Sequence, residues 1–208
     1  MQRTENPFDV GSSVYREDFF RPGKVTRQKL TEAETSYLLT LTALSLSAFN
    51  VNNCRFVVVR DPDLRKQIHK FAVNQSQIPH FSSLIILCAD LQGGEKKSEA
   101  NGSNNNNGEA EATTTPRKKG RQDQERQQRD DAMCSCGIAA QTFMLTAKAM
   151  GFDSWRLDGF HGEGIGKLIN LPEDYLVGLI LLVGKNLKPA CPNGRQINIH
   201  DIMVLDQF

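Results

Sequence analysis

A short loop of small and amide side chains is the stretch of this sequence best suited to holding a ligand. It contains Ser47, Asn50 and Asn52, and it lies between a helical pattern and a β-branched run at 56–59. Serine and asparagine side chains both donate and accept hydrogen bonds, so the loop can meet both kinds of edge group on a flat heterocycle. The same residue types are favoured in turns, which leaves a plain helix-to-strand connection as the alternative.

Length and composition favour one globular domain. The chain has 208 residues, 39% hydrophobic content and a formal net charge of +1. That size supports a real core, and the near-neutral charge gives no overall field that would favour nucleic acid or a membrane surface. No apolar run reaches the roughly 18 residues of a membrane span, and the N-terminus lacks the apolar segment of a secretory signal. We expect a cytoplasmic protein.

The cysteines do not form a recognisable framework. There are five of them, an odd number, at scattered positions. Neither a disulfide scaffold nor zinc-ligand spacing fits this pattern. We expect reduced thiols and no bound metal.

Hydrophobic periodicity predicts a series of helices and strands. Apolar positions at helical spacing predict a long helix over 27–48 with Thr26 as its cap, and Asp61 followed by Pro62 predicts the start of the next helix. Further helices are expected at 132–150 and 163–169, and strands at 55–60, 83–89, 154–157 and 176–183. This order predicts an α+β or α/β sandwich with one main sheet.

The helix expected at 132–150 is apolar over most of its circumference and should end at Gly151. A helix of that kind must be buried on more than one side, which in so small a domain suggests a second subunit. The tail, 197–205, alternates apolar and polar residues as an edge strand or an exchanged strand would.

Residues 92–131 form a polar low-complexity insertion with almost nothing apolar to bury. We expect it to be disordered, or at most a solvated helix near its end. Its basic run, 116–121, is also compatible with a nuclear-import or nucleic-acid patch, although a solvated insertion is favoured.

The ordered series of segments resembles the nitroreductase family of dimeric FMN-dependent NAD(P)H oxidoreductases. Residues 20–25 and the long helix after them resemble the start of the family's sequence, and 47–56 resemble its helix-to-strand flavin loop. Further similarities lie at Asn74-Gln75 before the strand 84–89, at the core helix running into 157–160, and at 182–184 with Arg195 further on.

The resemblance implies a single α+β domain over 1–208, a nitroreductase-like α-β-α sandwich with one mixed main sheet. It also implies a homodimer with an exchanged C-terminal strand and FMN bound at the subunit interface. NAD(P)H would pass hydride to flavin N5, and an electron-poor small molecule such as a nitroaromatic or quinone would then accept it. The flavin carries that chemistry, so no catalytic side chain is assigned.

The same resemblance implies a set of FMN contacts. Arg195 and Arg16 would meet the phosphate, and Asn74 the pyrimidine edge. Ser47, Asn50 and Asn52 would approach the ring from the amide loop, and backbone N–H groups at Asp158 and Gly159 would face N5. Solvated arginines, a turn-capping asparagine and a plain tight turn are the alternatives for these positions.

The sequence departs from the family pattern in two places. Where an Arg-Arg-Ser-type phosphate motif is usual, the stretch 12–19 has one cation, Arg16, beside two acids. In the flavin loop Leu46 replaces the usual proline, and Asn53-Cys54 replace a common Pro-Trp. We therefore expect FMN to bind more weakly than in the family, or in a different arrangement.

Three functions remain open from the sequence. The first is the FMN-dependent oxidoreductase, and the second is a protein that keeps the fold, with or without flavin, but has lost turnover. The third is a nucleic-acid partner acting through 117–129, against which the near-neutral charge argues.

Overall fold

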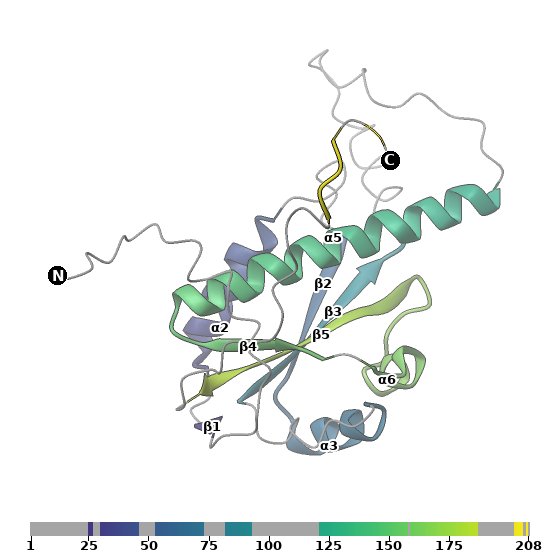
Figure 1. The fold of residues 1–208 in the computed structure, drawn as a ribbon. Coiled ribbons are helices and arrows are strands. Elements are labelled where there is room, and N and C mark those ends of the chain that lie inside the picture. The colour runs from purple at the N-terminus through teal and green to yellow at the C-terminus, as the bar shows by residue number, and fades with distance from the viewer. Residues whose placement is uncertain are drawn as a thin grey trace, which may run out of the picture.

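The computed structural model describes residues 25–26, 30–45, 53–72, 82–92, 121–157, 159–186, 202–205 and 207. Their helices and strands follow one another in an α+β order (Figure 1). The elements are β1 (Val25–Thr26), α2 (Glu32–Ala43), β2 (Cys54–Val59), α3 (Pro62–Lys70), β3 (Ser83–Asp90), α5 (Arg121–Ala149), β4 (Asp153–Arg156), α6 (Gly162–Leu168) and β5 (Tyr175–Asn186).

Strand β3 lies at the centre of the sheet and pairs with β2 on one side and β5 on the other. The far side of β5 pairs with β4, and the end of β5 also pairs with β1. Each of these pairings is antiparallel, so the expected mixture of strand directions is not found among the described strands. The expected α+β class with one main sheet is confirmed.

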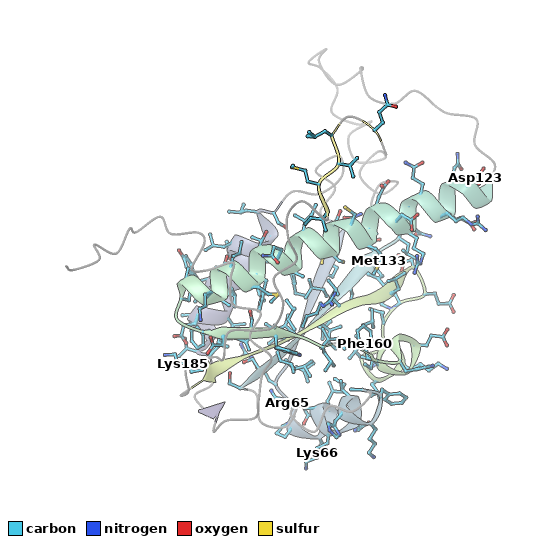
Figure 2. All side chains as sticks on the ribbon, in the orientation of Figure 1. Arg65, Lys66, Asp123, Met133, Phe160 and Lys185 are labelled. Atoms are coloured by element: carbon cyan, nitrogen blue, oxygen red, sulfur yellow. The ribbon has the colours of Figure 1, made fainter. Side chains whose placement is uncertain are left out.

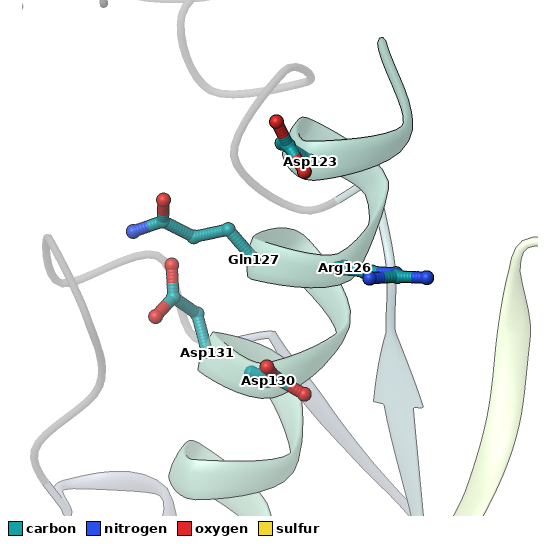
Figure 3. Close-up of a pocket in the computed structure, with 5 residues that line it drawn as sticks. All are labelled: Asp123, Arg126, Gln127, Asp130 and Asp131. Carbon is teal, nitrogen blue, oxygen red and sulfur yellow. The ribbon is translucent and has the colours of Figure 1, made fainter. Parts of the chain in front are cut away.

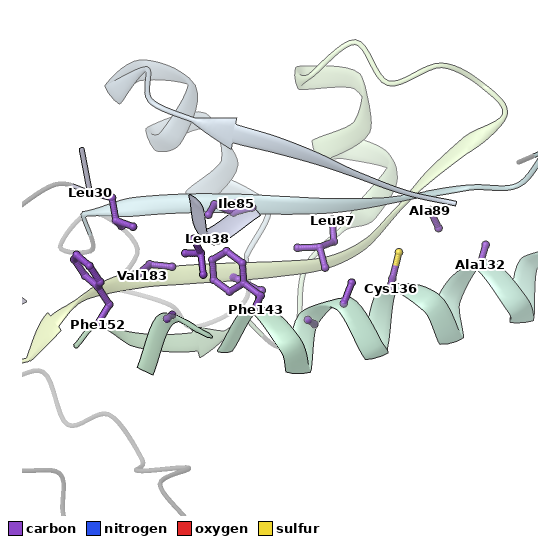
Figure 4. Packing of buried hydrophobic residues seen from close by; sticks show 14 residues of the cluster. Leu30, Leu38, Ile85, Leu87, Ala89, Ala132, Cys136, Phe143, Phe152 and Val183 are labelled. Carbon is purple, nitrogen blue, oxygen red and sulfur yellow. The ribbon is translucent and has the colours of Figure 1, made fainter. Parts of the chain in front are cut away.

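Every residue of β3 is buried, because helices cover both faces of the sheet. One core cluster joins the sheet to α2 and α5 (Figure 4), and the second joins it to α3 and α6. Alternate residues along β3, such as Ile85 and Ile86, belong to opposite clusters, as the two-residue period of a strand requires. The result is a three-layer α-β-α sandwich.

Helix α2 begins later than its periodicity suggests. A capping box fixes the start, in which Thr31 Oγ1 accepts from Glu34 N at 3.1 Å and Thr31 N donates to Glu34 Oε2 at 2.7 Å. The expectation that Thr26 caps this helix is wrong, because Thr26 belongs to β1. By contrast, the expected start of α3 is confirmed, with Asp61 as N-cap and Pro62 in its first turn.

Helix α5 begins at Arg121, within the polar insertion, and its first turns extend beyond the sheet (Figure 1). Most of the described side chains at 123–131 are exposed, and 93–120 lie outside the described residues, so the disorder expected for the insertion stays a prediction. The helix ends at Ala149, and Gly151 follows it with a φ of 77°, which confirms the expected glycine cap.

Helix α5 packs against the sheet and α2, but one stripe along it faces outward. Cys134, Gly137, Ile138 and Gln141 are exposed on this stripe, at the three- and four-residue spacing of one helix face. Within a single chain, the helix is therefore buried where it faces the sheet and α2, as expected, but it is not buried along this stripe.

In the tail, residues 202–205 do not lie in a strand, and their apolar side chains are exposed. The rest of the expected strand at 197–205 lies outside the described residues. Among the described residues, no helix is both long enough and apolar enough to cross a membrane.

Candidate functional site

Of the residues expected to hold FMN, Gly159 is the one within the described residues. It is exposed, and its φ of 72° is in the region that glycine adopts without strain. A backbone with no Cβ at an exposed turn permits a ligand to approach closely. The other expected contacts, namely Arg16, Ser47, Asn50, Asn52, Asn74, Asp158 and Arg195, lie outside the described residues.

The turn at Gly159 is fastened to the end of α3. His161 N donates to Phe71 O at 2.8 Å, and Ala72 forms an isolated antiparallel bridge with Phe160, the residue before the N-cap of α6 (Figure 2). Asn74 follows Ala72 by two residues, and Gly159 directly precedes Phe160. The bridge therefore anchors the two segments that carry these expected contacts to one another.

Helix α6 supports the same turn through a close contact that needs a glycine. His161 is its N-cap, and His161 Nδ1 accepts from Gly164 N at 3.0 Å. A Cβ on Gly164 would clash with the Phe71 ring and lie 2.9 Å from His161 Nδ1. Two glycines at 162 and 164, directly after His161, indicate a close approach of another group to the backbone. The sequence alone does not indicate that this group is the Phe71 ring.

At the opposite edge of the sheet, Asn53 connects the amide loop to β2. Asn53 is buried, and its backbone oxygen accepts from Asp90 N at 2.8 Å. Its side-chain oxygen is buried and has no hydrogen-bond partner among the described residues. A buried acceptor of this kind is costly unless a donor reaches it, so it marks a place where a ligand or water donor fits.

Asp90 fixes the end of the sheet next to that loop. Its carboxylate is 1% exposed, accepts from the Tyr175 hydroxyl at 2.9 Å and lies 3.6 Å from an Arg55 guanidinium nitrogen. Gln92 N donates to its other oxygen at 3.1 Å. The cluster ties the start of β2, the end of β3 and the start of β5 together. Hydrophobic periodicity does not predict this cluster, although an aspartate that ends an apolar run is a signal for a partnered carboxylate.

Within one chain these two regions lie at opposite edges of the sheet. Asn53 precedes β2, whereas Gly159 follows β4, and β3 and β5 run between those strands. Three inter-strand spacings separate β2 from β4, roughly 14 Å across the sheet. Within one subunit, Asn53 and Gly159 therefore lie on opposite sides of the sheet.

A surface hollow of about 390 Å³ lies along the polar first half of α5 (Figure 3). It is lined by Asp123, Arg126, Gln127, Asp130 and Asp131. These side chains come from one helix and are not part of either region described above. Among the described residues, no group of three or more His, Cys, Asp or Glu side chains is placed to hold a metal ion.

Helix layers on both faces of an antiparallel core sheet, with a glycine turn after β4, place the protein in the class of three-layer α+β sandwiches. The family model that describes the nitroreductase family matches residues 24–185, which span every helix and almost every strand residue of the described fold. The chain belongs to the nitroreductase family, and the resemblance seen in the sequence is confirmed.

Curated relatives and solved structures agree with this assignment. Protein DrgA of Synechocystis sp. is 33% identical over 170 residues, which cover 82% of this chain and 80% of that protein. YodC of Bacillus subtilis, which has a provisional name as an NAD(P)H nitroreductase, is 28% identical over 199 residues, 94% of this chain and 95% of that protein. A crystal structure from Exiguobacterium sibiricum, solved in complex with FMN, is similar in fold, with a TM-score of 0.73, 19% identity and 99% of each chain covered.

Proposed function

We propose that the protein is a cytoplasmic, FMN-dependent NAD(P)H oxidoreductase. Its acceptor would be an electron-poor small molecule such as a nitroaromatic or a quinone. The observation that carries this proposal is the family match over 24–185. It is supported by the relative named for NAD(P)H nitroreduction and by a neighbour in fold that was solved with FMN.

FMN, when bound, supplies the hydride chemistry through its N5 atom, between the nicotinamide and the acceptor. The chain's part is to hold and orient the flavin. Backbone N–H groups at Asp158 and Gly159 would face N5, and Asn74 would meet the pyrimidine edge. Ser47, Asn50 and Asn52 would contact the ring from the amide loop. Arg195 and Arg16 would pair with the phosphate, since guanidinium groups suit phosphate oxygens.

Two observations on described residues fit a flavin. Gly159 offers an exposed backbone without a side chain, and Asn53 presents a buried acceptor that has no donor among the described residues. The bridge between Ala72 and Phe160 supports a shared role for the Asn74 segment and the Gly159 turn. The end of β3 would help to position this acceptor, because the backbone N–H of Asp90 donates to Asn53 O.

We further propose that the active unit is a homodimer in which a single domain, 1–208, exchanges its C-terminal segment. The separation of the two regions within one chain supports this, because a second subunit could complete each site. The outward stripe of α5 and the exposed apolar residues 202–205 would then have a partner to bury them. The polar insertion, 92–131, is not assigned a part in catalysis.

Turnover is tested by NADPH oxidation in the presence of a quinone such as menadione, with and without added FMN. The proposal expects consumption of NADPH that requires both the acceptor and FMN. A protein that binds FMN but does not oxidise NADPH with any quinone or nitroaromatic would instead be a family member that lacks reductase activity.

The dimer is tested separately by light scattering on the eluting protein. The proposal expects twice the subunit mass for the wild-type chain. Ile138→Asp, on the outward stripe, should shift the protein toward the monomer and weaken FMN binding together. The control Gln127→Ala, on the part of α5 beyond the sheet, should change neither property. A wild-type monomer that binds FMN would overturn the dimer proposal.

A further inference from the structure

Two cysteine side chains meet between β2 and α5, and the proposed flavin chemistry makes no use of them. Cys54 is the first residue of β2, Cys136 lies in the buried face of α5, and their sulfur atoms are 3.3 Å apart. Figure 4 shows Cys136 on α5, facing the sheet. A disulfide needs a sulfur separation of about 2.05 Å, so a movement of little more than 1 Å would join them.

The close approach of helix and sheet at this point follows from small residues on both elements. Gly178 of β5 lies opposite Cys136, and a Cβ built there would be 3.4 Å from Cys136 Sγ and 3.3 Å from Leu87 O. On the helix, Ala132, Ala139 and Ala140 are buried beside Cys136. Small side chains let a helix lie close to a sheet, and the packed core then holds Cys136 at its distance from Cys54.

The two thiols differ in their access to solvent. Cys136 is fully buried, whereas Cys54 is partly exposed, so a small oxidant reaches Cys54 first. The hydrogen bond between the two thiols raises the pKa of Cys54, as does burial, and the same hydrogen bond lowers the pKa of Cys136, so Cys136 loses its proton first. Because the thiolate is the reactive form, the pair should stay reduced until an oxidant is supplied, and it should react faster at higher pH.

We propose that Cys54 and Cys136 form a site of reversible oxidation, at which hydrogen peroxide converts the thiol pair into an intramolecular disulfide. The more accessible Cys54 passes its proton across the hydrogen bond to the Cys136 thiolate. The resulting Cys54 thiolate attacks a peroxide oxygen, the O–O bond breaks, and the departing hydroxide takes a proton from solvent to become water. Cys136 sulfur then attacks the resulting sulfenic acid, the S–O bond breaks, and a second water leaves with the Cys136 proton. Two thiols lose two electrons in total, and one hydrogen peroxide is reduced to two waters.

The disulfide would covalently join a strand at the sheet edge to the central helix. The linked residues are far apart in the sequence and enclose the polar insertion 92–131, so the bond should restrict the unfolded chain strongly. The oxidised protein should therefore melt at a higher temperature than the reduced protein, by about 5 °C or more.

The test uses the full reduced chain treated with hydrogen peroxide, followed by alkylation of the remaining thiols and peptide mass spectrometry. The expected result is a peptide linking Cys54 to Cys136, with three of the five cysteines still alkylated. Dithiothreitol should restore all five, and the melting temperature should rise on oxidation and fall on reduction. None of these measurements requires flavin, so they do not depend on the proposed function.

Matched variants make the result specific. Cys54→Ser, at the partly exposed position, should lose both the linked peptide and the rise in melting temperature. Cys134→Ser, at the exposed thiol two residues from Cys136, should keep both. Gly178→Ala should slow the linkage severalfold while leaving the protein folded, because it pushes Cys136 away from the sheet. Oxidation of Cys54 to sulfinic acid with no linked peptide, or linkage through Cys134, would overturn the proposal.

Discussion

Replacing Gly159 by alanine separates the conformational role of this glycine from a role in holding FMN. The φ of Gly159 is 72°, a left-handed conformation that costs a residue with a Cβ about 1–2 kcal/mol. Gly151, at the end of α5, has a φ of 77° and open space where a Cβ would go, so it is a control with the same backbone demand. Both Gly159→Ala and Gly151→Ala should lower the free energy of unfolding by about 1 kcal/mol.

Only the first substitution should affect the flavin. At Gly159 the new methyl group would stand where the backbone is expected to approach N5, so FMN affinity should fall about tenfold or more, which corresponds to about 1.4 kcal/mol. Urea denaturation measures stability, and titration of the flavin-free protein with FMN, followed by quenching of flavin fluorescence, measures affinity. Equal FMN affinity in the two variants would refute the assignment of this turn to the flavin.

Three further substitutions test the described structure. Burial raises the pKa of Cys88 from 9.0 to about 12, so this thiol ionises at a lower pH in the unfolded chain than in the folded one. The free energy of unfolding should therefore fall between pH 9 and 12, by up to about 1.4 kcal/mol per pH unit. Cys88→Ala should reduce that slope, and an unchanged slope in urea denaturation at several pH values would contradict this. Asp90→Asn removes a buried charge that is partnered by Tyr175 and Arg55, so it should lower the free energy of unfolding, measured by urea denaturation, by about 1–3 kcal/mol. Tyr175→Phe removes one partner and should lower it less. A larger loss for Tyr175→Phe than for Asp90→Asn would be inconsistent with the cluster. Thr31→Ala removes the cap of α2 and should cost about 1 kcal/mol by the same assay, whereas no loss would show that the capping box does not stabilise the helix.

The parts of the fold that the sequence predicts well are those with local signals. Asp61 and Pro62 define the start of α3 by the chemistry of a helix N-terminus, and Gly151 defines the end of α5 by its freedom at positive φ. The unbroken apolar run at 83–89 predicts a strand buried on both faces, and β3 is such a strand. Each of these signals depends on residues that are neighbours in the chain.

The features that were missed depend on partners far away in the sequence. The start of α2 is an exception, because its capping box joins Thr31 to Glu34 only three residues later, a local signal that periodicity alone does not use. Asp90 meets Tyr175 and Cys54 meets Cys136 only because antiparallel strands and a crossing helix bring them together. The antiparallel direction of the described strands follows from the same long-range connections.

For the candidate site, the described residues relate two of the segments that the sequence indicates. The structure anchors the segment before Asn74 to the turn at Gly159 through Ala72 and Phe160, a pairing that no local pattern contains. The roles of Asn74 and of the amide loop in binding FMN remain predictions.

The central claim is that this chain binds FMN and passes electrons from NAD(P)H through it. The most direct measurement is the anaerobic visible absorbance spectrum of the purified protein, reconstituted with FMN and freed of unbound flavin, before and after addition of NADPH. We predict an absorbance band of bound flavin in the blue region of the visible spectrum. NADPH should bleach this band, and a quinone should restore it. A protein that retains no FMN after gel filtration, or a flavin band that NADPH leaves unchanged, would contradict the account.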